Sequence, residues 1–220
     1  MRGWPLPRHD RLFAWPSLVL SIVPTLPIMT FDERKLTPSF GYFFDARWHE
    51  PYESIVGVLW KFARMNALAG HVVFTQLCRQ PVDPYDGIAA TPVDVDVRAL
   101  ARLLGLPQKA LRAGLGRPGS PRTMSCNLRH CPRCMTHGYH SVVHQFLGAM
   151  QCPAHGDWLE EGCRVCGHKS DYRLDAQLLG APFQCALCRR PYGRSALRRA
   201  GTRPLPACVR TAITRAYCRS

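Results

Sequence analysis

Four short Cys- and His-bearing turns decide the fold of this chain: Cys131-Pro132-Arg133-Cys134, Cys152-Pro153-Ala154-His155, Cys163-Arg164-Val165-Cys166 and Cys185-Ala186-Leu187-Cys188. Two ligands separated by two residues on a tight turn can both reach one tetrahedral Zn²⁺, at about 2.3 Å for sulfur. Each turn, here called a knuckle, therefore supplies half of a site. The eight ligands predict two zinc ions in closed, structural sites.

The spacing of the knuckles leaves two pairings open. Sequential pairing joins the first knuckle to the second and the third to the fourth, across intervals of 17 and 18 residues that have room for a hairpin or a short helix. Cross-braced pairing joins the first to the third and the second to the fourth, as in RING-type domains. The intervals favour sequential pairing. In both arrangements zinc is expected to supply folding free energy, because the intervening loops have few apolar residues.

Cysteine usage indicates a reducing compartment. Of the eleven cysteines, seven lie in the knuckles, and a histidine takes the eighth ligand place. This spacing is typical of metal sites and not of disulfide scaffolds, and free thiolates must survive in order to bind zinc. We therefore expect a cytoplasmic protein. Cys126 lies close to the first knuckle and is an alternative ligand, although a buried or idle cysteine is commoner.

The charge distribution favours a polyanionic partner. The chain of 220 residues has a formal net charge of +14. No acidic residue occurs between Val97 and Gly156, a range with eight lysines or arginines, and none follows Asp175, after which there are nine arginines. Each cation placed on a phosphate releases a condensed counterion, so DNA is the expected partner. The alternative interpretation is an arginine-rich protein with a solvated surface.

The N-terminal 28 residues contain an apolar run that prolines interrupt. Residues from Leu12 to Ile28 include Pro16, Pro24 and Pro27. Prolines break the helical core of a signal peptide, and no apolar run reaches the about 20 residues of a membrane span. We expect a disordered leader or a misassigned start, and no membrane partner. The expected organisation is a leader (1–28), a helical domain (29–115), a linker (116–125), a tandem zinc-binding module (126–193) and a basic tail (194–220).

The expected fold is an α-rich, helix-turn-helix-like N-terminal domain followed by a small α+β double zinc-ribbon or zinc-finger module. In the N-terminal domain, Ile55, Leu59 and Phe62 recur at helical spacing. A second short helix is expected from Val72 to Leu77. The apolar and aromatic surface of this first helical pair is a candidate for contact with a protein partner.

A second helical pair is expected after a proline-rich loop. Asp94 or Asp96 can cap a helix that ends near Leu104, Gly105-Leu106-Pro107 forms a turn, and another helix occupies residues 108–115. This pattern resembles a helix-turn-helix, whose second helix lies in the major groove of DNA. A plain helical hairpin that packs its leucines has the same pattern.

Seven cations are the candidate nucleic-acid contacts. Lys109 and Arg112 would project from the last helix of the N-terminal domain toward phosphate or a groove. The other five follow the last knuckle, and contacts of this kind to the phosphate backbone depend on salt and not on sequence. These five arginines are Arg189, Arg190, Arg194, Arg198 and Arg199.

Histidines and an aromatic residue flank the second knuckle. His137, His140 and His144 in the first interval are expected to be solvated or packed between strands. Spare metal ligands or nucleic-acid contacts are the alternatives. Trp158 and Leu159 follow the second knuckle and are expected to pack between the two zinc modules.

The order of these features resembles the TniQ family, which includes the N-terminal part of TnsD-type transposon target-selection proteins. The resemblance rests on the succession C-x-x-C, C-P-x-H-G, C-x-x-C-G and C-x-x-C at residues 131–188, with helical segments upstream, and it covers residues 50–193. The resemblance implies a non-enzymatic accessory factor of DNA transposition, which helps to choose a target and bridges it to an AAA+ ATPase, to a transposase or to RNA-guided targeting proteins. It also implies that the eight knuckle residues are the zinc ligands.

Two other classes of function are open. The first is a transcription regulator that uses the same helix-turn-helix and prefers one operator. The second is a zinc-dependent nucleic-acid enzyme, such as a nuclease or a deaminase. The sequence favours the non-enzymatic interpretation, with no small-molecule substrate, because a catalytic zinc normally keeps one open position and a deaminase carries a Glu beside its ligand histidine.

Overall fold

The computed structural model describes residues 41–78, 80–115 and 124–193, together with Cys208, Thr211, Ala212 and Arg215. All of them belong to the second of two compact units in the chain, Gly41–Ser220. The expected leader (1–28), most of the expected linker, and Arg194, Arg198 and Arg199 lie outside the described residues.

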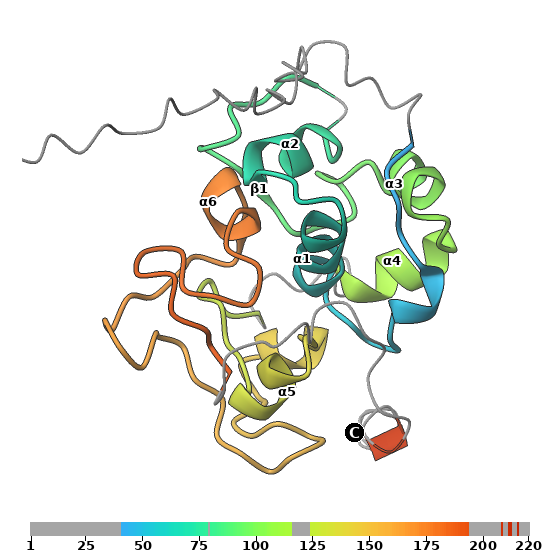
Figure 1. Ribbon diagram of the computed structural model, residues 1–220. Coiled ribbons are helices and arrows are strands. Elements are labelled where there is room, and N and C mark those ends of the chain that lie inside the picture. The colour runs from blue at the N-terminus through green and yellow to red at the C-terminus, as the bar shows by residue number, and fades with distance from the viewer. Residues whose placement is uncertain are drawn as a thin grey trace, which may run out of the picture. The chain divides into compact units, whose positions relative to one another are not determined.

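The described part of the chain is rich in short helices and contains a small sheet (Figure 1). Its sheet consists of β1 and β2, which pair antiparallel with Ile88 opposite Leu174. In chain order the elements are η3 (Ala46–Trp48), α1 (Ile55–Met65), α2 (Gly70–Thr75), β1 (Ile88–Ala89), α3 (Val97–Leu104), α4 (Gln108–Gly114), α5 (Pro132–Thr136), η5 (Val142–Gln145), β2 (Arg173–Leu174) and α6 (Ala176–Leu179).

Helix α1 lies in the core. Ser54 caps it by accepting a hydrogen bond from the Gly57 amide, as side chains of this type do at helix starts. Every residue from Ile55 to Ala63 is buried. Each fully buried large apolar side chain contributes about 1.5–3 kcal/mol. The expectation that the first helical pair offers a protein partner an apolar surface was therefore wrong for this helix, because its faces are already covered.

Helix α2 packs against α6, far along the chain (Figure 1). A Cβ at Gly70 would lie 2.0 Å from the Ala176 carbonyl oxygen and 2.5 Å from the Gly180 amide nitrogen. Only glycine permits two backbones to approach this closely. Helix α2 begins at Gly70, two residues before the expected start at Val72.

Helices α3 and α4 form the second expected hairpin. The Asp96 carboxylate accepts hydrogen bonds from the Arg98 and Ala99 amides at the start of α3, which ends at Gly105. Helix α4 begins after Pro107, and its end at Gly114 packs on the start of α1, since a Cβ at Gly114 would lie 2.5 Å from the Glu53 carbonyl oxygen. The expected bounds of this hairpin are confirmed to within a residue, whereas its insertion into a DNA groove stays a prediction.

One hydrophobic core draws on both halves of the described chain. It contains Trp60 and Leu100 from the helical half, and Leu174, Phe183 and Tyr192 from the half that holds the knuckles. The Trp60 Nε1 donates a hydrogen bond to the Leu178 carbonyl oxygen, at 2.7 Å. The expected boundaries between the helical domain, the linker and the zinc-binding module stay predictions. The helical half and the half that holds the knuckles nevertheless share this core. Within the ranges that the structure describes, no helix has the length and apolar character needed to cross a membrane.

The expected burial of Trp158 between the metal modules was wrong. Trp158 is 64% exposed, whereas Leu159 packs against the buried cysteines of the first and second knuckles. The two residues belong to a strand-like segment in which Trp158 pairs with Gln151 and the Leu159 amide donates to the Met150 carbonyl. Because successive side chains of an extended segment point to opposite faces, burial of Leu159 directs Trp158 outward.

Candidate metal centres

The knuckles pair sequentially into two four-ligand clusters. The first consists of Cys131, Cys134, Cys152 and His155, and the second of Cys163, Cys166, Cys185 and Cys188. Within each cluster the ligand atoms all lie within 4.8 Å of one another. Sequential pairing, which the intervals favoured, is confirmed, and cross-braced pairing is excluded. Cys126 is exposed and belongs to neither cluster.

The distances within the clusters fit a tetrahedral metal ion. Metal–sulfur bonds of about 2.3 Å place two sulfurs at the vertices of a tetrahedron about 3.8 Å apart. The Cys134–Cys152, Cys163–Cys188 and Cys166–Cys185 sulfur pairs are each 3.6 Å apart. These cysteines are free thiols and not disulfides, whose sulfurs would lie about 2.05 Å apart.

The histidine of the first cluster is placed equally well. The Nδ1 atom of His155 lies 3.5, 3.3 and 3.6 Å from the sulfurs of Cys131, Cys134 and Cys152. Bonds of about 2.05 Å to nitrogen and 2.3 Å to sulfur predict a tetrahedral N···S separation of about 3.6 Å. Four protein ligands would occupy every position around a tetrahedral ion, so the donor set has the form of a structural site.

Three of the four knuckles share one backbone device. In each, the amide four residues after the first cysteine donates to that cysteine's carbonyl oxygen, and the donating residue has a positive φ. Gly156 and Gly167 fill this place in the second and third knuckles, with φ of 68° and 72°. Arg189 fills it in the fourth, with φ of 59°. Glycine adopts this region without a steric cost, whereas a residue with a Cβ does not.

The first knuckle is built differently, at the start of a helix. Cys131 is the N-cap residue of α5, Pro132 occupies the first helical position, and the Met135 amide donates to the Cys131 carbonyl. Proline suits this position because its fixed φ is helical and its missing amide hydrogen would have no helical acceptor. Cys134, one turn along, then joins Cys131 in the first cluster.

An ion pair clamps the two knuckles of the first cluster. The Arg133 Nε and Nη2 atoms donate to the two carboxylate oxygens of Asp157 at 2.7 and 2.8 Å, and Nη2 also donates to the His155 carbonyl at 2.6 Å. The hydrogen bonds to Asp157 raise the pKa of the Arg133 guanidinium. This fork geometry holds the second knuckle in register with the first.

The segments that carry the two clusters, here called the first and second metal modules, contact each other through residues that flank the knuckles. His130, just before the first knuckle, exchanges both backbone hydrogen bonds with Glu160, which lies between the modules. The His130 ring also lies 4.4 Å from the ring of Tyr192, which follows the fourth knuckle. A Cβ on the next residue, Gly193, would lie 2.9 Å from the Thr136 amide nitrogen at the end of α5. The modules therefore pack as one body.

The first module is joined to α1 through a buried histidine. The Ser54 hydroxyl and the His140 Nδ1 are 2.6 Å apart, and the His140 Nε2 lies 2.8 Å from the Arg129 carbonyl oxygen. Because a carbonyl only accepts, Nε2 carries the proton and Nδ1 accepts from Ser54. Burial lowers the pKa of His140 to about 4, so the ring is neutral near pH 7. His140 and His144 are buried, so of the two expected environments, solvated or packed, these two histidines have the packed one.

The clusters differ in exposure to solvent. The three cysteines of the first cluster are at most 2% exposed. In the second cluster Cys166 is exposed and Cys188 is half-buried, while Cys163 and Cys185 contribute to the main hydrophobic core.

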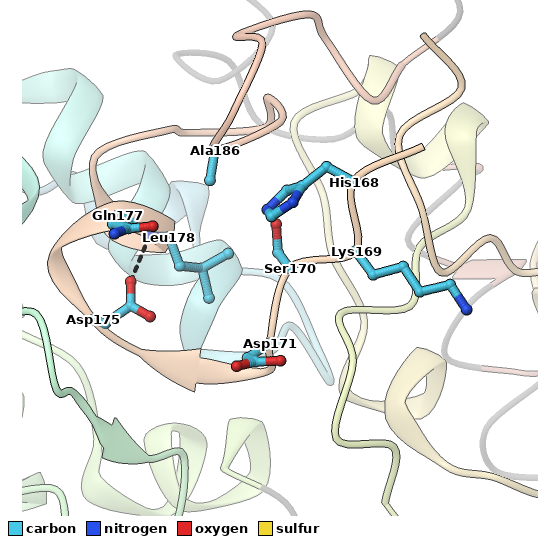
Figure 2. A pocket seen from close by; sticks show the side chains of 8 residues that line it. All are labelled: His168, Lys169, Ser170, Asp171, Asp175, Gln177, Leu178 and Ala186. Carbon is cyan, nitrogen blue, oxygen red and sulfur yellow. Dashed lines mark hydrogen bonds between the residues drawn. The ribbon is translucent and has the colours of Figure 1, made fainter. Parts of the chain in front are cut away.

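A small polar pocket borders the second cluster. Its volume is about 120 Å³, room for a few water molecules of about 30 Å³ each. Figure 2 shows the side chains that line it, with the Asp175 carboxylate engaged as the cap of α6 through the Leu178 amide. Burial raises the pKa of Asp175. The lining residues are His168, Lys169, Ser170, Asp171, Asp175, Gln177, Leu178 and Ala186.

Four of the seven residues that are expected to contact nucleic acid lie in the described part of the chain. Lys109 and Arg112 are exposed on α4, and Arg189 and Arg190 are exposed after the last knuckle. The Arg189 Nη1 donates to the Gly180 carbonyl at 2.7 Å. Their contact with DNA stays a prediction.

No family model matches this sequence, and no curated protein matches it significantly.

Proposed function

We propose that this chain is a non-enzymatic accessory factor of DNA transposition, which binds DNA and bridges target-site machinery to an AAA+ ATPase or transposase. The class of function comes from the resemblance of the knuckle succession to the TniQ family. The observation that supports it best is that the knuckles pair in sequence order, the first with the second and the third with the fourth, into two four-residue clusters. Both clusters use the residues that the resemblance implies as ligands.

Zinc is the proposed occupant of both clusters. Three thiolates with one imidazole, and four thiolates, are donor sets that suit Zn²⁺ in tetrahedral geometry. The chemistry that zinc would supply is structural. It would hold the knuckles together and couple their folding to metal binding. Cytoplasmic residence follows as part of the proposal, since these thiolates must stay reduced.

DNA binding is proposed from charge. The described residues from Val97 to Leu115 and from Met124 to Gly156 contain no acidic side chain. Phosphate contacts made by lysine and arginine give affinity that falls steeply with salt and depends little on base sequence. A bridging factor needs such a contact only to stay on the target while it holds its protein partner.

Metal content and co-purification test the proposal together. Purified from its native host, the chain is expected to carry two zinc ions and to retain a transposition ATPase or transposase. A chain without metal would refute the zinc assignment. Binding of one operator orders of magnitude more tightly than random duplex, with no transposition partner retained, would instead favour a transcription regulator.

A further inference from the structure

The strongest cationic feature of the described residues beyond the expected contacts is on α3. Arg98 and Arg102 are both exposed and lie four residues apart, so their side chains are neighbours on one face of the helix, with Cβ atoms about 5–6 Å apart. Leu100 and Leu104 are buried on the other side. Lys109 and Arg112, three residues apart on α4, are likewise exposed.

These four cations have no acidic partner among the residues that the structure describes. The exposed or half-exposed cations Arg47, Arg133, Arg164 and Lys169 each form an ion pair with a carboxylate. No such pair involves Arg98, Arg102, Lys109 or Arg112 within the described ranges, and α3 and α4 themselves contain no acidic residue. Within these ranges, no carboxylate neutralises their charge.

Local helix stability does not explain where two of these cations lie. Arg98 and Lys109 are in the first turns of α3 and α4, neither of which has an acidic residue in that turn. The positive end of the helix macrodipole favours carboxylates at these positions and disfavours cations. The macrodipole therefore gives these two cations no stabilising role within their own helices.

The surface chemistry favours a nucleic-acid backbone over a protein partner. The cores of protein interfaces are depleted in charge and contain apolar or aromatic anchors. In the described part of the chain, no large apolar residue of α3 or α4 is strongly exposed. Exposed cations on two neighbouring helices, without an apolar anchor, suit the phosphates of DNA.

We propose that both helices of the α3–α4 hairpin face the phosphate backbone of duplex DNA, with Arg98 and Arg102 as contacts alongside Lys109 and Arg112. This inference rests on the proposed DNA binding and locates it on the protein. Both helices, and not the second alone, lie against the duplex, so the hairpin binds across the backbone with little preference for base sequence.

The test is the salt dependence of binding to a short random-sequence duplex, measured by fluorescence anisotropy between about 50 and 200 mM salt. Each phosphate contact contributes about −0.9 to the slope of log K against log salt. Arg98→Gln with Arg102→Gln is expected to make the slope less negative by about 1.8. Adding Lys109→Gln and Arg112→Gln should bring the change to about 3.6.

The matched control is Arg164→Gln with Lys169→Gln, two cations that already pair with Glu160 and Glu161. The control should leave the slope close to that of the unaltered chain. Circular dichroism and metal content establish that each variant is folded.

A slope that Arg98→Gln with Arg102→Gln leaves unchanged, in a chain that binds duplex, would overturn the inference and leave the proposed function standing. The inference is also overturned if these substitutions weaken only the retention of a protein partner. No duplex binding by the unaltered chain would overturn the proposed DNA binding itself.

Discussion

Arg189 occupies a backbone position that suits glycine. Its φ of 59° matches those of Gly156 and Gly167 at the equivalent places in the preceding knuckles. A side chain in this region costs about 1–2 kcal/mol. Part of the gain from glycine is offset by greater freedom of the unfolded chain and by loss of the exposed hydrogen bond from Arg189 to the Gly180 carbonyl.

We therefore expect Arg189→Gly to raise the free energy of unfolding of the metal-loaded chain by up to about 1 kcal/mol, measured by urea denaturation. Arg190 is the control, because its φ is not positive. Arg190→Gly should be neutral or lower the stability. Destabilisation by Arg189→Gly beyond that of the control would contradict the strain argument.

His140 predicts an acid-sensitive stability. Its pKa is lowered from 6.5 to about 4 by burial, so the unfolded chain binds more protons than the folded chain between these values. The contribution of His140 to the free energy of unfolding is therefore fully present above about pH 6.5. It is lost as the pH falls toward 4, and the loss is up to about 3 kcal/mol.

The measurement compares urea unfolding of the unaltered chain and of His140→Gln at several pH values in this window. Loss of metal in acid affects both chains, so the difference between them isolates the histidine. The variant should be less stable near pH 7 and should lose less stability on acidification. Parallel pH profiles would show that His140 does not carry the effect.

Individual residues also show what the sequence could reveal. The eight residues of the two clusters were predictable because two-residue spacing is a local signature of metal binding. The pairing of Ser54 with His140 was not, since it joins residues 86 apart. The exposure of Arg98 and Arg102 on one face of α3 could have been predicted from their spacing opposite Leu100 and Leu104. Trp158 was misplaced because a large apolar side chain was assumed to be core.

At the scale of elements, the contact between α2 and α6 depends on Gly70. A Cβ there would lie 2.0 Å from the Ala176 carbonyl oxygen, which is backbone and cannot rotate away. Gly70→Ala is expected to lower the free energy of unfolding by about 3 kcal/mol. This steric cost exceeds the roughly 1 kcal/mol by which alanine normally stabilises a helix relative to glycine. Gly148→Ala is the control, because nothing lies within 4 Å of its Cβ position. Equal melting temperatures for the two variants would show that α2 and α6 do not approach this closely.

Once loaded with zinc, the two clusters should release their ions at different rates. Cys166 of the second cluster is exposed, whereas the cysteines of the first are at most 2% exposed. A chelator reaches a metal–sulfur bond through solvent, so the second cluster should lose its ion first. With a colorimetric indicator we expect two phases of one equivalent each. Cys166→Ser should abolish the fast phase, and a fast phase that survives it would reverse the assignment.

Helical elements were easier to predict than their surroundings. Asp96 caps a helix whose apolar spacing is regular, so α3 begins where it was expected. Helix α1, which was expected to begin near Pro51, begins one turn later at Ile55, because Ser54 is its cap and not part of its first turn. Helix α2 begins two residues earlier than expected, and the close contact of Gly70 with α6 is one that a local pattern does not contain. The bridges between Glu53 and Ser141 and between His130 and Glu160 are similarly non-local.

At the scale of the whole molecule, the metal modules and the helices are not independent. The sequence predicted that removing the metal would unfold the C-terminal half. Yet that half supplies Leu174 and Phe183 to the core around α1, and its Leu178 carbonyl accepts the hydrogen bond of the buried Trp60 indole. Loss of the modules would expose apolar surface on α1 and leave Trp60 without its acceptor, and an unsatisfied buried donor costs about 1–3 kcal/mol.

We therefore expect metal removal to unfold the helical half as well. Chelation under reducing conditions should eliminate most of the helical circular dichroism signal and shift the tryptophan fluorescence of the chain, with zinc restoring both. The matched comparison is Trp60→Phe, which keeps an aromatic ring but not the donor and should lose helicity at lower chelator concentration. A chain that keeps its helical signal after both ions are removed would contradict this expectation. It would show that the helices fold without the metal-binding half and do not need the shared core.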